Sequence, residues 1–121
     1  RRGAAAQFFV FCASGGRLGG GITLSNIRYG ASCSGMLGYW IGVDYLRRGY
    51  ARAAVHALLD HAFGRLGLHR VEAACQPTNE ASRRLLLSAG FHEEGFARRY
   101  LKINGVWRDH LLFAATEDEH R

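Results

Sequence analysis

The sequence has one proline, one methionine and one lysine among 121 residues, and three widely spaced cysteines. So little proline, with a hydrophobic share of 48%, excludes a disordered chain and fits one domain with a single core. Cys12, Cys33 and Cys75 are odd in number and form no CxxC pair, which excludes a disulfide framework and favours a reducing cytoplasm. No apolar run approaches the ~20 residues of a membrane span. We expect one cytoplasmic domain over residues 1–121, without metal or membrane contact.

Positive charge is in excess, with 16 Lys and Arg against 10 Asp and Glu and a formal net charge of +6. A basic domain can bind nucleic acid, an anionic membrane surface or a phosphorylated small molecule. An arginine- and alanine-rich genomic composition produces the same excess without any such function. The placement of the arginines must therefore decide between these readings.

Hydrophobic periodicity predicts strands and helices in the order β-β-β-α-β-α-β-β. Alternation marks the strands, an apolar stripe marks the first helix, and Asn79 is the expected N-cap of the second. Gly67 and Gly90 are expected to end the two helices, and Asn104-Gly105 is a strong hairpin signal. The predicted strands are 7–13, 21–27, 38–46, 70–75, 96–103 and 106–114, and the predicted helices are 51–66 and 79–90.

The stretch YLRRGYAR, residues 45–52, places two arginines and a glycine where a predicted strand meets a predicted helix. The first turn of a helix exposes unpaired N–H groups, and a glycine lets a phosphate approach the backbone closely. The stretch thus has the parts of a pyrophosphate cradle, although an ordinary turn with surface arginines also fits. Neither GxxxxGK[ST] nor a helix-opening GxGxxG is present, so a pyrophosphate used as a handle suits the sequence better than a reacting nucleoside triphosphate.

Residues 38–63, GYWIGVDYLRRGYARAAVHALLDHAF, resemble motif A of the GNAT superfamily of acetyl-CoA-dependent N-acetyltransferases. Leu46 departs from the first position of that motif's loop, Q/R-x-x-G-x-G/A. The later chain is similar to the RimJ/RimL branch, which acetylates protein N-terminal amines. The shared features are an Asn-x-x-Ser pair, a GF-x-x-EG turn and an NG-x-W-x-DH hairpin, and the likeness covers roughly residues 20–115.

The resemblance implies an α/β (α+β) fold with a mixed, mainly antiparallel sheet flanked by helices, and acetyl-CoA as cosubstrate. It implies that the strand with Ile41 and Val43 splays from its neighbour at 71–75, so that the pantetheine arm pairs with exposed backbone. A backbone N–H near Val43 is expected to stabilise the developing oxyanion. The implied coenzyme contacts are Ile41, Val43, Leu46, Arg47, Arg48, Gly49, Tyr50, Ala51, Asn79 and Ser82.

Ser82 is implied as the catalytic group that protonates the departing thiolate, although a serine in a first helical turn is often just a solvated polar residue. Asn79 can serve as N-cap alone or also contact the coenzyme. No general base stands out; the candidates are Glu72, Glu93 and Glu94. A protein α-amine, with a pKa near ~8, needs only water or a weak base.

The expected acceptor is a protein N-terminal amine, such as that of a ribosomal protein. The alternatives are a small-molecule amine (an antibiotic or a polyamine), a coenzyme-binding protein without activity, or a basic nucleic-acid-binding module. Direct nucleic-acid binding is not expected, because the aromatic residues lie inside apolar strand patterns. The strand and two helices that usually open the fold have no counterpart, so we expect an N-terminally truncated domain that turns over poorly.

Other polar residues are predicted to be structural. His56 and His61 are five residues apart and do not predict a metal pair. His69, His92 and His110 are interpreted as surface or packing residues. Cys75 is expected to be an inert buried thiol near the coenzyme slot. Arginines 83, 84, 98 and 99 form either a solvated face or a contact to a 3′-phosphate or an RNA-rich partner.

Overall fold

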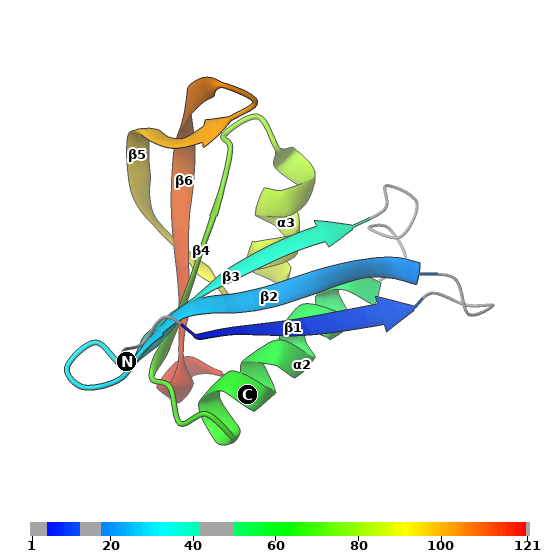
Figure 1. The fold of residues 1–121 in the computed structure, drawn as a ribbon, viewed down its shortest axis with the longest axis vertical. Helices are drawn as coiled ribbons and strands as arrows, with labels where there is room; N and C mark the ends of the chain where they lie inside the picture. Colours follow the sequence, from blue (N-terminus) through cyan, green and yellow to red (C-terminus); the bar gives the residue numbers. More distant parts are fainter. Residues whose placement is uncertain (1–4, 13–17, 42–49, 121) are drawn as a thin grey trace.

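The computed structural model describes residues 5–12, 18–41 and 50–120. Over these residues the chain forms one six-stranded sheet in the order β1-β2-β3-β4-β6-β5 (Figure 1). All neighbouring strands are antiparallel except β3 and β4, which are parallel and are connected through α2. The elements are β1 (Ala5–Cys12), β2 (Leu18–Arg28), β3 (Ser34–Ile41), α2 (Tyr50–Gly64), β4 (Arg70–Cys75), α3 (Glu80–Ser88), β5 (His92–Ile103), β6 (Val106–Thr116) and the 3₁₀ helix η1 (Glu117–Glu119).

The observed order confirms the predicted mixed, mainly antiparallel α/β fold. Strand β2 begins at Leu18 and β5 at His92, three and four residues before their predicted starts, so most of the predicted GF-x-x-EG turn belongs to β5. The start of β3 is also shifted. This strand begins at Ser34, four residues before the predicted start, because Ser34 pairs with both Arg28 of β2 and Arg70 of β4. Gly35 is buried there, and a Cβ on it would lie 3.0 Å from Cδ1 of Leu24. Close packing in the sheet explains a segment of small residues that resembles a loop. The predicted end of this strand, 42–46, lies outside the described residues.

Both helix ends follow the predicted chemistry. Gly67 has a φ of +67°, and the next N–H, of Leu68, donates to the Ala62 carbonyl at 2.9 Å. Gly90 has a φ of +99°, and the N–H of Phe91 donates to the Leu86 carbonyl at 3.0 Å. The bond after Gly90 spans five residues and is that of the Schellman motif, whereas the bond after Gly67 reaches back one residue further.

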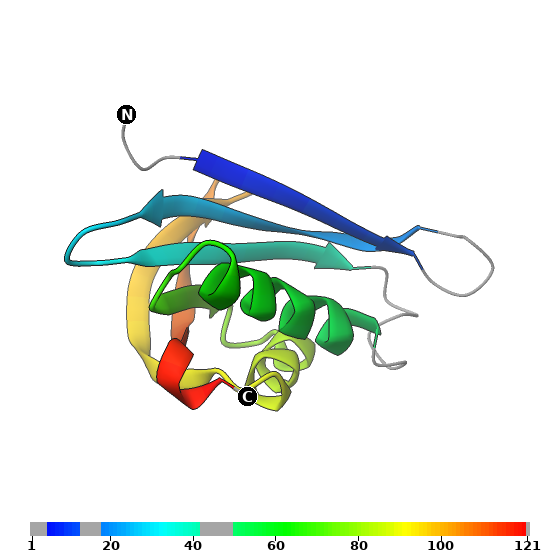
Figure 2. The same ribbon diagram turned by 90° about the horizontal axis from the view of Figure 1, so that it is seen from below.

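The core lies between the sheet and the two helices. Helix α2 runs beneath β1 to β3 (Figure 2), and α3 packs against α2, β4 and β5. Helix α2 contributes its apolar stripe to this core, as the 3.6-residue period predicts. The buried residues of the stripe are Val55, Leu58, Leu59, Ala62 and Phe63. Among the described residues, no helix has the length and apolar character needed to cross a bilayer.

Candidate active site

Strands β3 and β4 are paired over only three residues each. The described ladder joins Ser34–Met36 to Arg70–Glu72 and goes no further. Beyond it, β3 follows β2 as far as Ile41, while β4 follows β6 as far as Cys75. Figure 1 shows the two strands diverging from that point. The expected splay is confirmed, and it turns backbone of both strands toward the gap between them.

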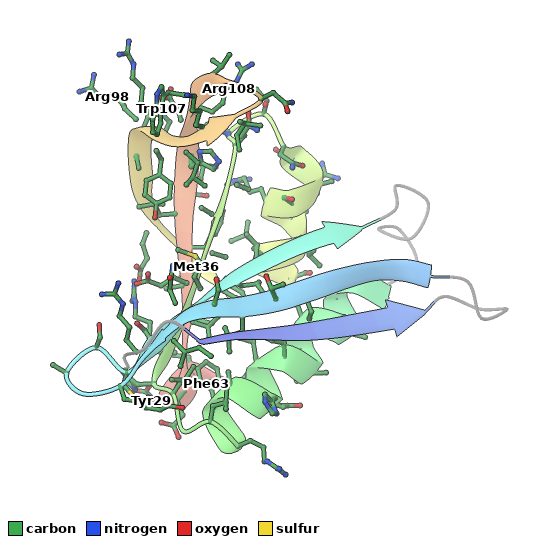
Figure 3. The ribbon with its side chains drawn as sticks, viewed as in Figure 1. Tyr29, Met36, Phe63, Arg98, Trp107 and Arg108 are labelled. Atoms are coloured by element: carbon green, nitrogen blue, oxygen red, sulfur yellow. The ribbon has the colours of Figure 1, made fainter. Side chains whose placement is uncertain are left out.

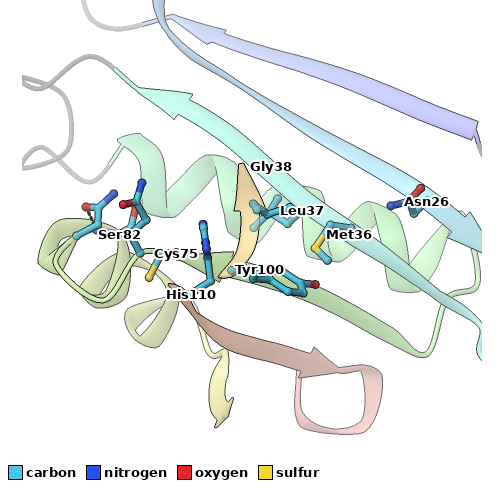
Figure 4. A pocket seen from close by; sticks show the side chains of 12 residues that line it. Asn26, Met36, Leu37, Gly38, Cys75, Ser82, Tyr100 and His110 are labelled. Atoms are coloured by element: carbon cyan, nitrogen blue, oxygen red, sulfur yellow. Dashed lines mark hydrogen bonds between the residues drawn. The ribbon is translucent and has the colours of Figure 1, made fainter. Parts of the chain in front are cut away.

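A pocket of about 490 Å³ lies in this gap (Figure 4). Its walls come from β2, β3, the end of β4, the start of α3 and the β5–β6 hairpin. The lining residues are Asn26, Met36, Leu37, Gly38, Ala74, Cys75, Gln76, Asn79, Ser82, Tyr100, Leu101 and His110. The lining combines apolar surface with a few polar groups, a composition typical of small-molecule sites, and its described residues include no carboxylate.

Asn79 and Ser82 enter this pocket from the first turn of α3. The Asn79 side-chain oxygen accepts the Ser82 backbone N–H at 3.2 Å, which confirms Asn79 as the N-cap. Both residues line the pocket, and Ser82 lies at one side of it (Figure 4). Their predicted contacts with the coenzyme, and the proton-donor role of Ser82, remain predictions.

His110 was interpreted as a surface or packing residue at the end of an element. Its burial agrees with the packing alternative, but it does not lie at the end of an element. It lies inside β6, is 4% exposed, and is the one buried polar residue in the described part of the chain. Its ring points into the pocket beside Tyr100, with the ring centroids 5.8 Å apart. The Nδ1 of His110 lies 3.0 Å from the Arg108 carbonyl, which can only accept, so Nδ1 carries the proton in this bond. In the neutral ring, Nε2 is then left as a proton acceptor.

A bulge in β5 accounts for the position of Tyr100. Ala97 pairs with His110 and Leu101 with Arg108, so β5 carries two extra residues between these pairs. Arg99 adopts a φ of +48°, and its N–H donates to the Asp109 carboxylate at 2.9 Å. Bulges of this kind redirect side chains near functional sites. No local sequence signal marks the burial of His110, because the residues that follow it, 111–115, are all apolar and show no alternation.

The three glutamates considered as bases lie outside the pocket lining. Arg70 pairs with Glu72 at 2.8 Å and also with Glu94, while Arg83 pairs with Glu93 at 3.0 Å. The hydrogen bond from Arg70 lowers the pKa of Glu94, which makes its carboxylate a weaker base.

Cys75 lines the pocket and is buried, as predicted. Burial raises the pKa of its thiol, so the thiol stays protonated and unreactive at neutral pH.

The predicted cradle falls mostly outside the described residues. Residues 42–49 are not among the described residues, and they contain five of the predicted coenzyme contacts: Val43, Leu46, Arg47, Arg48 and Gly49. On either side of this segment, β3 ends at Ile41, and α2 begins at Tyr50 and continues through Ala51. The cradle therefore remains a prediction, with its flanking strand and helix in the expected places.

Comparison with known proteins supplies the family. The family described as "Acetyltransferase (GNAT) domain" matches residues 1–92. The chain belongs to the GNAT acetyltransferase family. It is 44% identical over 108 residues to the probable N-acetyltransferase YjcK of Bacillus subtilis, covering 89% of this chain and 60% of that protein. It is 34% identical over 116 residues to the [ribosomal protein uS5]-alanine N-acetyltransferase of Escherichia coli, covering 96% and 60%. The chain thus spans about 60% of the length of these two GNAT relatives.

Solved structures of GNAT enzymes agree with the fold. The ribosomal-protein-S5-alanine acetyltransferase of Vibrio fischeri has a TM-score of 0.87 and 36% identity, covering 96% of this chain and 64% of that one. RimJ of Mycobacterium smegmatis, in complex with CoA-disulfide, has a TM-score of 0.84 and 41% identity, covering 93% and 55%. Spermidine N-acetyltransferase SpeG of Vibrio cholerae has a TM-score of 0.83 and 26% identity, covering 96% and 68%.

Proposed function

We propose that this protein transfers the acetyl group of acetyl-CoA to a primary amine, and that the amine is a protein N-terminus. The observation that carries the proposal is the splay of β3 from β4 over a pocket that holds Asn79 and Ser82. Strand backbone that is not paired with a neighbouring strand can form hydrogen bonds with the amides of a pantetheine arm, as it would with an added strand. The RimJ neighbour was solved with a coenzyme A disulfide, which supports coenzyme binding by a chain of this fold.

The pyrophosphate of the coenzyme would lie at the start of α2. A helix N-terminus offers free N–H groups and a positive dipole end, both of which favour phosphate. Arg47, Arg48 and Gly49 directly precede Tyr50, the first residue of α2. In this proposal the two arginines add charge-assisted hydrogen bonds, and Gly49 permits close approach.

In the reaction that we propose, the acceptor nitrogen bonds to the thioester carbonyl carbon and the carbon–sulfur bond breaks. Acetyl-CoA supplies the activated acetyl group. The hydroxyl of Ser82 gives its proton to the departing sulfur and regains one from solvent. The proton that the amine loses passes to Nε2 of His110 and from there to solvent. Both residues line one pocket, which places donor and acceptor groups around the same space (Figure 4).

The pocket chemistry favours an acceptor that is not a polycation. A polyamine carries several positive charges, and sites for such ligands supply carboxylates to pair with them. The described lining has none, whereas it offers apolar surface from Met36, Leu37 and Leu101. The likeness to ribosomal-protein-alanine acetyltransferases supports a protein N-terminal acceptor. Spermidine remains the second candidate because of the likeness to SpeG.

Competition between acceptors tests the proposal. Acetyl-CoA is supplied with a peptide that begins with alanine, with the same peptide blocked at its N-terminus, and with spermidine. We expect coenzyme A release and a mass increase on the free peptide only. Preferential acetylation of spermidine would establish the second candidate. Absence of acetyl-CoA binding would refute the enzymatic proposal as a whole.

A further inference from the structure

A second group of chemically active side chains lies on α2 and at the C-terminal end, away from the pocket lining. His56 and Asp60 are four residues apart on α2 and so share one helix face. His120 reaches the same face from the segment that follows η1. His120 Nε2 lies 2.6 Å from one Asp60 oxygen, and His56 Nδ1 lies 3.7 Å from the other. One ligand atom from each residue lies within 4.8 Å of the other two.

These three groups are the donor set of a transition-metal site. Two imidazoles and one carboxylate are ligands that Zn²⁺ and similar divalent ions prefer. Zinc holds such nitrogen and oxygen atoms at about 2.0–2.2 Å, so tetrahedral ligand atoms are roughly 3.4 Å apart. The observed separations lie on both sides of that value. Coordination of one ion would therefore require small shifts of His56 and Asp60, whose side chains are about half exposed.

His120 is the anchored member of the group. Its side chain is 11% exposed and packs against Phe63, with the ring centroids 5.2 Å apart. The backbone N–H of His120 donates to the Glu117 carbonyl at 3.2 Å, and the Glu117 N–H donates to the carbonyl of His69 at 2.9 Å. Backbone contacts thus fix this imidazole before any ion binds. A pocket of about 250 Å³ beside His56 and His120 has room for water ligands.

We propose that His56, Asp60 and His120 bind one divalent transition-metal ion, of which Zn²⁺ is the best match, and that water completes its coordination. The ion would fasten the C-terminal segment to α2. The site shares no residue with the pocket between β3 and β4. Its role is structural and separate from acetyl transfer. The proposal departs from the expectation of no metal, which rested on the lack of a CxxC pair and on the spacing of His56 and His61.

Metal binding is measured on the full chain after treatment with a chelator. Zn²⁺ is titrated in competition with a chromophoric chelator, and Co²⁺ replaces it for absorption spectroscopy. We expect saturation at a single ion, a d–d spectrum without thiolate charge transfer, and a rise in melting temperature with Zn²⁺. Absence of saturable binding, or a thiolate band that indicates cysteine ligands, would overturn the proposal.

Variants assign the ligands. His120→Ala and Asp60→Asn should each abolish saturable binding and the Zn²⁺-dependent rise in melting temperature. His69→Ala is the matched control, because it removes an exposed histidine outside the cluster. Circular dichroism in chelator shows whether each variant folds, and the two ligand variants provide independent tests. Binding equal to the parent in Asp60→Asn, or an equal loss in His69→Ala, would mean that the cluster is only an ion pair.

Discussion

Ser82 and His110 reach the same pocket from two elements that differ in how they hold a side chain. The N-cap bond from Asn79 fixes the first turn of α3 and with it Ser82. A hydrogen bond to the Arg108 carbonyl and a ring contact with Tyr100 fix His110. Groups held this way need little reorganisation during the reaction. The two residues therefore make separate predictions.

Ser82→Ala should lower kcat with little change in affinity for acetyl-CoA. If the hydroxyl protonates the thiolate, its contribution arises mainly in the transition state. General acid catalysis contributes ~10²–10⁴-fold, which sets the expected loss in kcat. Ser88→Ala is the control, since Ser88 lies on the same helix, outside the pocket lining, and donates to the Leu85 carbonyl. A Ser82→Ala enzyme with the parent kcat would remove Ser82 from the mechanism.

His110→Gln should lower kcat, and the size of the loss should depend on the basicity of the acceptor amine. A proton acceptor matters most for amines that hold their proton tightly, such as a lysine side chain (pKa ~10.4), and less for an α-amine (pKa ~8). We expect kcat to fall within ~10²–10⁴-fold, with the larger loss for the more basic acceptor. His92→Gln, at an exposed position, is the control. Equal losses for both acceptors would indicate a packing role for His110.

At the scale of elements, local patterns determined most of what could be predicted. Helix caps and strand alternation depend on neighbours within a few residues, so Asn79, Gly67 and Gly90 were predicted correctly. The bulge between Ala97 and Leu101 depends on pairing with β6, which no local pattern reveals.

The candidate sites were less predictable than the elements, because they join distant parts of the chain. The contact between Asp60 and His120 joins residues 60 apart. The pocket is likewise lined by residues from β3, α3 and β6, which are far apart in the sequence. Only the family resemblance placed Asn79 and Ser82 in one site beforehand, and nothing in the sequence placed His110 beside them.

Gly90→Ala tests the ending of α3. Gly90 has a φ of +99°, and a Cβ there would meet nothing within 4 Å, so strain and not crowding determines the cost. Left-handed backbone costs an L-residue about 1–2 kcal/mol, which is the expected loss in the free energy of unfolding. Gly64→Ala, within α2 and also in open space, should be neutral or stabilising by up to about 1 kcal/mol. Urea unfolding measures both, and equal effects would contradict the strain argument.

The Arg70–Glu94 ion pair links β4 to β5 across the intervening β6 and predicts that stability depends on pH. The pKa of Glu94 is lowered, mainly by the hydrogen bond from Arg70. A carboxyl with a lowered folded-state pKa stabilises the protein above its unfolded pKa of ~4.3, and this term is lost as the pH falls through the folded value.

Glu94→Gln should therefore reduce the free energy of unfolding by at most about 1 kcal/mol at pH 7, because the pair is partly exposed. The difference between parent and variant should shrink as the pH falls below ~4, since the parent then loses the same interaction. Urea unfolding across this range provides the measurement. A difference that grows toward low pH would contradict the assigned sign. Glu117→Gln, at an exposed acidic position on η1, is the control.

At the scale of the whole molecule, the net charge is +6, and the arginines that the structure describes differ in whether an acidic group neutralises them. Glutamates pair with Arg70, Arg83 and Arg84, which removes these arginines from any basic patch. Arg98 and Arg108 lie instead at the exposed end of the β5–β6 hairpin, beside Trp107 (Figure 3). This distribution favours a domain that binds a small anionic ligand at one site over a domain that binds nucleic acid along a basic surface.

Acetyl-CoA and oligonucleotides should therefore have different effects on the protein. Acetyl-CoA binds the native state alone in our proposal, so it should raise the melting temperature; at 100 times Kd the gain is about 2.7 kcal/mol. Single-stranded RNA or DNA should bind weakly and lose affinity steeply with added salt, as non-specific phosphate contacts do.

Gly49→Val should reduce the rise in melting temperature that acetyl-CoA causes, because a branched side chain directly before α2 would block the pyrophosphate. Ala53→Val, at an exposed position on α2, is the matched control. Tight, salt-resistant oligonucleotide binding without a coenzyme effect would favour the nucleic-acid module, and a Gly49→Val variant that responds like the parent would place the pyrophosphate elsewhere.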